Sequence, residues 1–481
     1  MPARTGQQYI DGLSKNPAEV WISGEKVEDV TTHPAFKNGV RSLASLYDMQ
    51  HNPATKEAMT FASPSSGDPV GLSFIIPKTI EDLVRRREMM THWAWESCGM
   101  MARTPDFLNN AVSGWAGSSD YFIDNRPEFK DNVLRYHEFI RENDLTLTHT
   151  LVNLQRSRNS AVVDNIEKQV ALTVVKETDA GIVVHGSRIL ATLGPISDEI
   201  AVYPTRTHIL GKDAWRQAFS FALPCNTPGM RFMCRESLDL GRSSFDHPLG
   251  ARFEEMDALV FFDNVLVPWE RVFLYREPLA ANRLFRGNVM SWASYAGSVL
   301  TQLRMEVLVA VAHLLAVTSG VDKRPNVVST LGEMCTYLSL ARSNLRAGEI
   351  DCIRTPGGHY RTAAAPERRA LVTMVSERFV ELVEHIGTSS LIFLPTAEDW
   401  TAPELKKHLD VYMRGKGISP IDRYKLCRLA WDLTGDGYGG RQQLYERLHS
   451  GDPTMVVQNA YRRFDLSGGI DLVTNFLDLE Q

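Results

Sequence analysis

The sequence has little cysteine, no surplus of basic residues and no long apolar run, and each shortage excludes a class of protein. Its six cysteines are scattered over 481 residues, and none has the close spacing of a zinc or iron–sulfur site. Acidic residues outnumber basic ones by 58 to 52, so no cationic excess is left for nucleic acid. The longest apolar stretch, Val307–Val317, contains His313 and is too short to span a bilayer. We therefore expect a cytoplasmic protein without a metal centre.

Local patterns divide the chain into three predicted parts. Residues 1–143 have helical spacing of apolar side chains between proline-containing turns, which predicts an N-terminal α-helical domain. Residues 144–275 form a predicted middle β domain, with a hairpin where Thr173–Thr178 and Ile182–Gly186 flank a glycine-containing turn. Residues 276–481 return to longer amphipathic helices, which predict a C-terminal helical bundle domain. The predicted fold class is α+β.

A glycine motif at Gly435–Gly440 formally matches the G-x-G-x-x-G of dinucleotide-binding proteins. In those proteins a strand precedes the motif, whereas here Tyr424–Leu433 has the spacing of an amphipathic helix. The chain also lacks the alternation of strands and helices that a Rossmann domain requires. We therefore predict a turn between two helices at this motif, with glycine supplying a positive φ.

Two residues near predicted boundaries could carry chemistry. His149 lies where the helical part gives way to the β part, and an imidazole can accept a proton near neutral pH, although a lone histidine is more often structural. Arg103 stands at a break between predicted helices, where a guanidinium either pairs with an anion such as phenolate or is solvated. The chain contains no G-x-S-x-G, H-E-x-x-H or Walker motif. The residues alone thus indicate a large α+β enzyme and leave its reaction open.

Short segments distributed from residue 24 to residue 453 share their pattern with one known family. The segments are Gly24–Val27, Thr32–Phe36, Tyr47–His51, Gly99–Leu108, Thr148–His149, Ser244–Leu249, Glu255–Asp257, Val265–Phe273, Leu444–Arg447 and Gly451–Pro453. Together they resemble the oxygenase component of the two-component, reduced-flavin-dependent phenol hydroxylases, the 4-hydroxyphenylacetate 3-monooxygenase family.

This resemblance implies an acyl-CoA dehydrogenase-like fold, with an N-terminal helical domain, a middle β-barrel-like domain and a C-terminal four-helix bundle, assembled as a homotetramer (a dimer of dimers). It also implies a separate NAD(P)H–flavin reductase that supplies reduced flavin, FADH2 rather than FMNH2. With O2 as co-substrate, the reduced flavin gives a hydroperoxide that hydroxylates a phenol ortho to its hydroxyl and yields a catechol. The implied substrate is 4-hydroxyphenylacetate or a related 4-hydroxyphenyl compound.

The resemblance assigns roles to individual residues. Arg103 and His149 become the catalytic residues, because they would hold the phenol oxygen and favour its deprotonation. The substrate pocket would be completed by Phe107, Thr205, Arg206 and Tyr295. The implied flavin contacts are His149, Thr150, Leu151, Gln155, Arg158, Thr192, Arg441, Gly451, Asp452 and Pro453.

The sequence departs from the family pattern at three pocket positions. Phe107 stands where 4-hydroxyphenylacetate hydroxylases generally carry tyrosine, and Tyr295 stands where related enzymes often have histidine. Arg206 adds a cation, which we interpret as a partner for a substrate carboxylate. A larger tyrosine-like or coumarate-like phenol and a halophenol therefore remain alternative substrates.

Three other functions stay open at this point. A 4-hydroxybutyryl-CoA dehydratase of the same fold needs cysteine ligands for an iron–sulfur cluster, but Cys98 is followed four residues later by Ala102. An acyl-CoA dehydrogenase-type flavoenzyme needs a carboxylate base, and the sequence offers no basis for choosing one. A non-catalytic scaffold would have no reason to retain Arg103 and His149.

Overall fold

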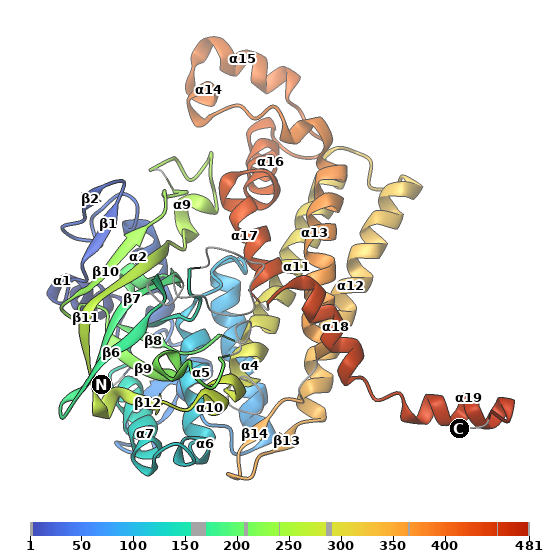
Figure 1. Cartoon of the computed structure of the whole chain (residues 1–481). Helices are drawn as coiled ribbons and strands as arrows, with labels where there is room; N and C mark the ends of the chain where they lie inside the picture. The colour runs from blue at the N-terminus through green and yellow to red at the C-terminus, as the bar shows by residue number, and fades with distance from the viewer. Residues whose placement is uncertain are drawn as a thin grey trace.

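The computed structural model describes residues 3–154, 170–205, 210–239, 241–284, 291–363, 366–449 and 451–479. Figure 1 shows a region of sheets and N-terminal helices lying beside a bundle of long helices. Gln155, Arg158 and Arg206, which the resemblance assigns to the site, lie outside the described residues.

The N-terminal region is mainly helical. Its helices are α1 (Gly6–Lys15), α2 (Lys37–Asp48), α3 (Lys56–Met59), η1 (Leu72–Phe74), α4 (Ile80–Glu96), α5 (Pro105–Gly117), α6 (Asp120–Ile123) and α7 (Pro127–Glu142). Helix α4 begins at a capping box formed by Thr79 and Asp82, and Pro105 provides the first residue of α5. Arg103 lies in the short connection between these two helices, which fixes where its side chain leaves the backbone.

Two open sheets form the β region. The strands are β1 (Val20–Ile22), β2 (Glu25–Lys26), β3 (Thr60–Ala62), β4 (Pro69–Gly71), β5 (Leu147–Thr150), β6 (Thr173–Thr178), β7 (Gly181–Thr192), β8 (Glu199–Val202), β9 (Phe219–Pro224), β10 (Met230–Cys234), β11 (Asp257–Pro268) and β12 (Val272–Tyr275). One sheet has the order β2-β1-β10-β11-β7-β6 and the other β12-β9-β8-β5, while β3 pairs with β4. The described strands do not close into a barrel, so the barrel-like domain implied by the resemblance is two open sheets.

Pairing within the sheets tests the predicted hairpin and shows one pairing that was not predicted. The predicted hairpin is confirmed, because β6 and β7 are antiparallel and meet at Thr178 opposite Gly181. Strands β1 and β2 belong to the N-terminal region, yet β1 pairs in parallel with β10 and so joins the larger sheet. Short helices η2 (Gly194–Ile196), η3 (Trp215–Gln217), α9 (Gly250–Phe253) and η4 (Trp269–Arg271) connect the strands.

Long helices form the remainder of the chain. They are α10 (Pro278–Arg283), α11 (Ser291–Thr318), α12 (Pro325–Ile350), α13 (Pro366–Gly387), η5 (Thr388–Leu391), α14 (Ala397–Thr401), α15 (Pro403–Tyr412), α16 (Pro420–Thr434), α17 (Gly437–Leu448), α18 (Pro453–Arg463) and α19 (Ser467–Leu477), with a small hairpin of β13 (Ile353–Arg354) and β14 (Tyr360–Arg361). Helix α11 is apolar and long enough to cross a membrane, with a mean hydropathy of 1.5, but 61% of that apolar window is buried inside the protein. It is therefore the core helix of the bundle (Figure 1).

The glycine motif is a turn between helices, as predicted. Gly435 ends α16 and Asp436 caps the start of α17, so no strand precedes the motif. The predicted reason is wrong, because Gly435 has a φ of −106°. The motif instead needs small residues for close packing, since a Cβ on Gly439 would lie 2.6 Å from the carbonyl oxygen of Asp432.

Candidate active site

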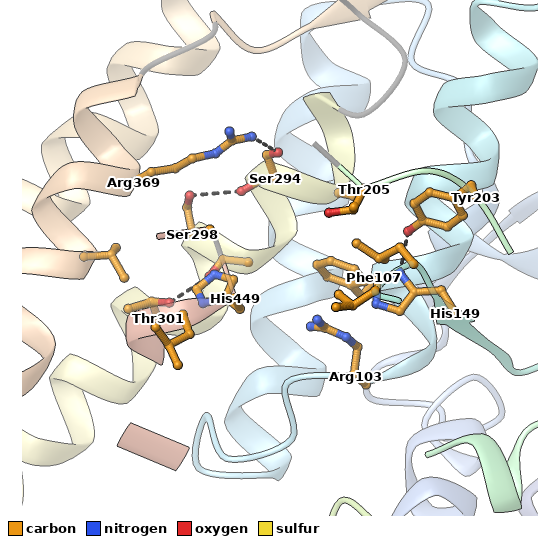
Figure 2. A pocket seen from close by; sticks show the side chains of 17 residues that line it. Arg103, Phe107, His149, Tyr203, Thr205, Ser294, Ser298, Thr301, Arg369 and His449 are labelled. Atoms are coloured by element: carbon orange, nitrogen blue, oxygen red, sulfur yellow. Dashed lines mark hydrogen bonds between the residues drawn. The ribbon is translucent and has the colours of Figure 1, made fainter. Parts of the chain in front are cut away.

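A cavity of about 170 Å³ lies between the β region with α5 and the helical bundle. Its described lining residues are Arg103, Phe107, His149, Leu151, Val152, Tyr203, Thr205, Ala293, Ser294, Gly297, Ser298, Thr301, Arg369, Val372, Leu448, His449 and Gly451 (Figure 2). A cavity of about 150 Å³ holds one benzene ring, so this volume suits a ligand with a single aromatic ring.

Strand β5 determines which residues of its segment face the cavity. It pairs in parallel with β8, with His149 opposite Ala201. Side chains alternate along a strand, and the hydroxyls of Thr148 and Thr150 point to the other side, where they donate to carbonyl oxygens of β7. His149 therefore faces the cavity together with Leu151.

His149 is a buried, neutral imidazole. Its Nδ1 forms a short hydrogen bond with the hydroxyl of Tyr203, in which either atom can be the donor (Figure 2). Burial lowers the pKa of His149 well below its ordinary value, and the nearby positive charge of Arg103 lowers it further. Among the described residues that line this end of the cavity, the formal charge near neutral pH is carried by Arg103.

The guanidinium of Arg103 is held against aromatic rings and not against a carboxylate. Its Cζ lies 4.1 Å from the centre of the Phe107 ring, and its Nη1 donates to the Ala102 carbonyl oxygen at 3.1 Å and to the Tyr445 hydroxyl. Its Nε is buried and has no hydrogen-bond partner in the part of the chain that the structure describes. Phe107 in turn packs edge-on to His149, with ring centres 5.7 Å apart. The three predicted residues Arg103, Phe107 and His149 thus meet at one end of the cavity.

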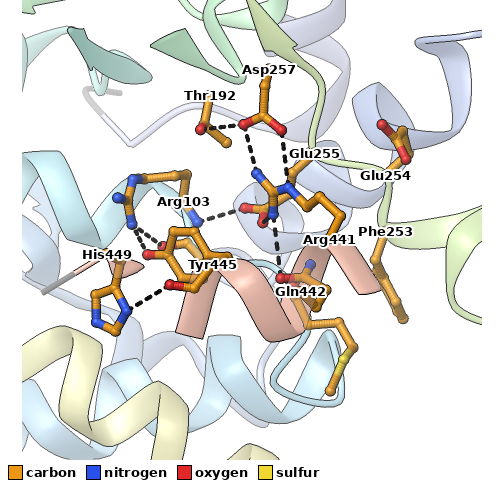
Figure 3. Close-up of polar contacts among 12 residues, drawn as sticks. Arg103, Thr192, Phe253, Glu254, Glu255, Asp257, Arg441, Gln442, Tyr445 and His449 are labelled. Atoms are coloured by element: carbon orange, nitrogen blue, oxygen red, sulfur yellow. Dashed lines mark hydrogen bonds and ion pairs between the residues drawn. The ribbon is translucent and has the colours of Figure 1, made fainter. Parts of the chain in front are cut away.

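A buried ion-pair network fixes the backbone of Arg103 (Figure 3). Glu255 accepts a hydrogen bond from the Arg103 amide at 2.6 Å through Oε1, and its Oε2 lies 3.0 Å from Nη1 of Arg441. Arg441 also contacts Asp257 at 2.7 and 3.0 Å, and the Thr192 hydroxyl donates to Asp257 at 2.6 Å. Burial acts to raise the pKa of Asp257, but Arg441 holds it well below its ordinary value.

The structure brings together only some of the residues predicted to contact flavin or substrate. Thr205, Leu151 and Gly451 line the cavity. Thr192 and Arg441 belong to the ion-pair network and are not among the residues lining the cavity. These positions do not test whether the residues contact flavin or substrate, so these roles stay predictions.

Four other predicted residues point elsewhere. Thr150 donates its hydroxyl to Ile189, as described above. The Tyr295 hydroxyl donates to Glu349 of α12 at 2.7 Å, and Tyr295 is not among the described residues that line the cavity. Asp452 caps α18 by accepting from the Met455 amide at 3.0 Å, and Pro453 follows as the first residue of that helix.

Sequence reasoning missed most residues on the bundle side of the cavity. His449, the residue that ends α17, lines the cavity, and its ring stacks on that of Tyr445, which lies four residues earlier behind the lining, with ring centres 4.9 Å apart. His449 Nδ1 lies 3.1 Å from two backbone carbonyl oxygens, so it carries a proton and leaves Nε2 as the acceptor. Burial lowers the pKa of His449, and it is neutral as well. The i, i+4 spacing of two aromatic residues just before Gly451 was the available signal.

Polar groups beside the cavity fit a flavin ring. Asn153 follows β5 and has a buried Oδ1 that finds no hydrogen-bond donor among the described residues and can accept from a ring N–H. A Cβ on Gly451 would meet no atom within 4 Å, so the backbone there is open to a ligand. The segment after β5 and the loop before α18 are therefore the two places whose polar groups suit a flavin ring.

The structure defines an enzyme of acyl-CoA dehydrogenase-like fold with an internal cavity large enough for one aromatic ring. Family models described as the N-terminal and C-terminal parts of 4-hydroxyphenylacetate 3-hydroxylase match residues 5–274 and 281–478. The chain belongs to the 4-hydroxyphenylacetate 3-hydroxylase family.

Individual relatives agree with this assignment. The 4-hydroxyphenylacetate 3-monooxygenase oxygenase component of Thermus thermophilus is 39% identical over 96% of this chain and 95% of its own. The oxygenase component of a Rhodococcus 4-nitrophenol 2-monooxygenase is 30% identical over 94% of this chain and 87% of its own. A crystal structure of a 4-hydroxyphenylacetate 3-monooxygenase oxygenase component with FAD and 4-hydroxyphenylacetate has a TM-score of 0.93 at 38% identity, covering 99% of this chain and 98% of that one. An archaeal 4-hydroxybutyryl-CoA dehydratase shares the fold at 20% identity, with a TM-score of 0.89 over 100% of this chain and 96% of that one.

Proposed function

We propose that this chain is the oxygenase component of a two-component monooxygenase that hydroxylates a phenol ortho to its hydroxyl and produces a catechol. The substrate is 4-hydroxyphenylacetate or a related 4-hydroxyphenyl compound. The observation that carries the proposal is the Arg103 guanidinium, whose buried Nε has no partner among the described residues, beside neutral His149 in a cavity sized for one ring. The oxygenase components among the relatives support it.

Arg103 and His149 bind the phenol oxygen and favour the phenolate. A buried cation lowers the pKa of a phenol next to it, and the ring is more nucleophilic when the oxygen is deprotonated. His149 contributes a hydrogen bond and no charge, because its pKa is lowered. Tyr203 fixes the imidazole through Nδ1, which leaves Nε2 to face the substrate oxygen.

The proposed cofactor is FAD, delivered in reduced form by a separate NAD(P)H–flavin reductase, with O2 as co-substrate. Bound reduced flavin supplies the activation of O2. Relatives have been solved with FAD, and the backbone of His149–Leu151, Asn153 and the Gly451 loop would hold it here. The apolar side chains of Leu151, Val152 and Val372 line the cavity and keep water from the reacting atoms.

We further propose a cytoplasmic homotetramer. No residue of α19 is buried, although the helix carries large apolar side chains, and Figure 1 shows it extending away from the bundle. Its exposed apolar residues are Ile470, Leu472, Val473, Phe476 and Leu477. An exposed apolar helix of this kind is typical of a protein–protein interface, and we propose that another copy of the chain packs against it. Light scattering coupled to size-exclusion chromatography measures the assembly.

Two alternatives are disfavoured by particular residues. An acyl-CoA dehydrogenase needs a carboxylate base, and none of the described residues lining the cavity is a carboxylate. An iron–sulfur dehydratase needs cysteine ligands, whereas the group within the described ranges that could hold a metal ion is His247, Asp432 and Asp436. A halophenol or nitrophenol hydroxylase differs only in substrate and is tested with the same assay.

The decisive experiment supplies the purified protein with a generic NADH–flavin reductase, FAD, air and a panel of phenols, and measures catechol formed against hydrogen peroxide released. Catechol from a 4-hydroxyphenyl compound supports the proposal, and peroxide alone from every phenol contradicts it. His149→Ala should lower catechol formation about 10²- to 10⁴-fold while leaving reduced-flavin binding nearly unchanged. Equal losses of both would make His149 a flavin ligand only.

A further inference from the structure

The bundle wall of the cavity is polar although it belongs to the most apolar long helix. Helix α11 has a mean hydropathy of 1.5 over its apolar window. Ser294, Ser298 and Thr301 nevertheless follow one another at helical spacing, and all three line the cavity. Ser298 donates to the Ser294 carbonyl oxygen at 3.1 Å, which satisfies its own hydroxyl within the helix. This stripe places hydroxyls against the cavity and apolar side chains against the core.

Arg369 completes this polar wall from the neighbouring helix α13. Its Nη2 donates to the hydroxyl of Ser294, which holds the guanidinium at the edge of the cavity. Figure 2 shows the Arg369 side chain reaching toward Ser294 on the side of the cavity opposite Arg103 and His149. The cavity therefore has a guanidinium at each of two separated ends.

The charges around the cavity favour an occupant with two acidic groups. Arg103 and Arg369 are cations, the two histidines have lowered pKa values, and no described lining residue is acidic. A guanidinium matches a carboxylate with two parallel hydrogen bonds. A 4-hydroxyphenyl acid carries its phenol and its carboxylate at opposite ends of one ring, so it has one acidic group for each guanidinium.

We infer that Arg369, positioned by Ser294, binds the carboxylate of the phenolic substrate and so makes the enzyme specific for 4-hydroxyphenyl acids. This inference rests on the proposed function. It places the carboxylate partner on the bundle, whereas the sequence suggested Arg206. A guanidinium would bind a flavin phosphate by the same chemistry, and the experiment below separates the two anions.

The test compares 4-hydroxyphenylacetate with 4-hydroxyphenylacetamide, which is neutral and nearly the same shape. Arg369→Gln should raise KM for the acid about 10- to 100-fold, as expected for a lost charge-assisted hydrogen bond, with kcat at saturation nearly unchanged. KM for the amide should change less than about threefold, because a neutral amide loses no ion pair. Arg369→Lys should restore part of the affinity for the acid. Arg378→Gln, on the exposed face of the same helix, is the matched control and should change neither KM.

Each other outcome overturns the inference in a recognisable way. If Arg369→Gln raises KM for acid and amide equally and weakens FAD binding, the anion is the flavin phosphate. If Arg206→Gln raises KM for the acid but not for the amide, and Arg369→Gln raises neither, the carboxylate partner is Arg206. If wild-type protein forms catechol and Arg369→Gln behaves like wild type, only this inference fails. If wild-type protein forms catechol from neither compound, the proposed function fails and the inference fails with it.

Discussion

Replacing Arg441 with glutamine tests whether the buried ion-pair network supports the site. The Arg441 side chain is 14% exposed and contacts Asp257 at 2.7 Å and Glu255 at 3.0 Å. In the variant Asp257 keeps its contact with Arg235 at 3.0 Å. Glu255, whose side chain is fully buried, loses its ion pair with Arg441. Removing one partner of a buried pair typically costs about 3–5 kcal/mol, because the other charge stays buried.

This cost converts to a measurable shift in the unfolding temperature. At about 2.1 cal/mol/K per residue, the unfolding entropy is about 1 kcal/mol/K for 481 residues. Arg441→Gln should therefore lower the midpoint by about 3–5 °C in differential scanning calorimetry at pH 7.5. Arg378→Gln removes an exposed arginine that contacts Glu333 at 2.7 Å, and it should leave the midpoint unchanged.

The effect of Arg441→Gln should depend on pH. Arg441 depresses the pKa of Asp257, so the pair contributes its full stability above about pH 4, the ordinary value, and loses it as the pH falls through the depressed value. The contribution of the Arg441–Asp257 pair to the difference in stability between wild type and variant should thus be full from pH 7.5 to about 5 and decrease below pH 4. A midpoint lowered by less than 1 °C at pH 7.5, or a difference that does not narrow in acid, would refute the reasoning.

Two further predictions concern Phe107 in the wall of the cavity and Gly99 in the connection between α4 and α5. Phe107→Tyr should raise kcat/KM for small 4-hydroxyphenyl acids about fivefold, because one added hydrogen bond near the phenol contributes about 1 kcal/mol. Unchanged selectivity in steady-state kinetics would count against a pocket role for Phe107. Gly99→Ala should lower the free energy of unfolding by about 2–5 kcal/mol, because Gly99 has a φ of +71° and its Cβ would lie 2.9 Å from the backbone nitrogen of Arg304. Gly67→Ala, with a φ of +78° and no atom within 4 Å, should cost only about 1–2 kcal/mol in the same denaturation experiment, and equal losses would show that the close contact is unimportant.

Features set by neighbouring residues were predictable from the sequence. The hairpin of β6 and β7 follows from β-branched runs around a short turn, and the helix–helix turn at Gly435–Gly440 follows from the helical spacing before it. Strand β1 was not predicted, because it has three residues and its partner β10 lies about 210 residues further along the chain. A strand this short gives no periodic pattern, and its formation depends on the sheet it joins.

The candidate site was predictable only in part, for the same reason. The family resemblance named Arg103, Phe107 and His149, and the structure places them together. It did not name Arg369, which is 75 residues from its contact Ser294 and belongs to no recognisable motif. Residues this far apart in the sequence form no local pattern, so the residues of the bundle wall can be found only from a structure.

The position of the acidic residues explains how Arg103 keeps its charge available to a ligand. Glu255 accepts a hydrogen bond from the Arg103 amide at 2.6 Å, so a carboxylate lies close to Arg103 without a recorded contact to its guanidinium among the described residues. Arg441 compensates the charge of Glu255 from the far side, and within the described part of the chain the Arg103 guanidinium contacts neutral oxygens and rings. If Arg441 is removed, the negative charge of Glu255 acts on Arg103 without compensation. The phenol would then be harder to deprotonate, so Arg441→Gln should lower kcat/KM for phenols as well as stability, although Arg441 does not line the cavity.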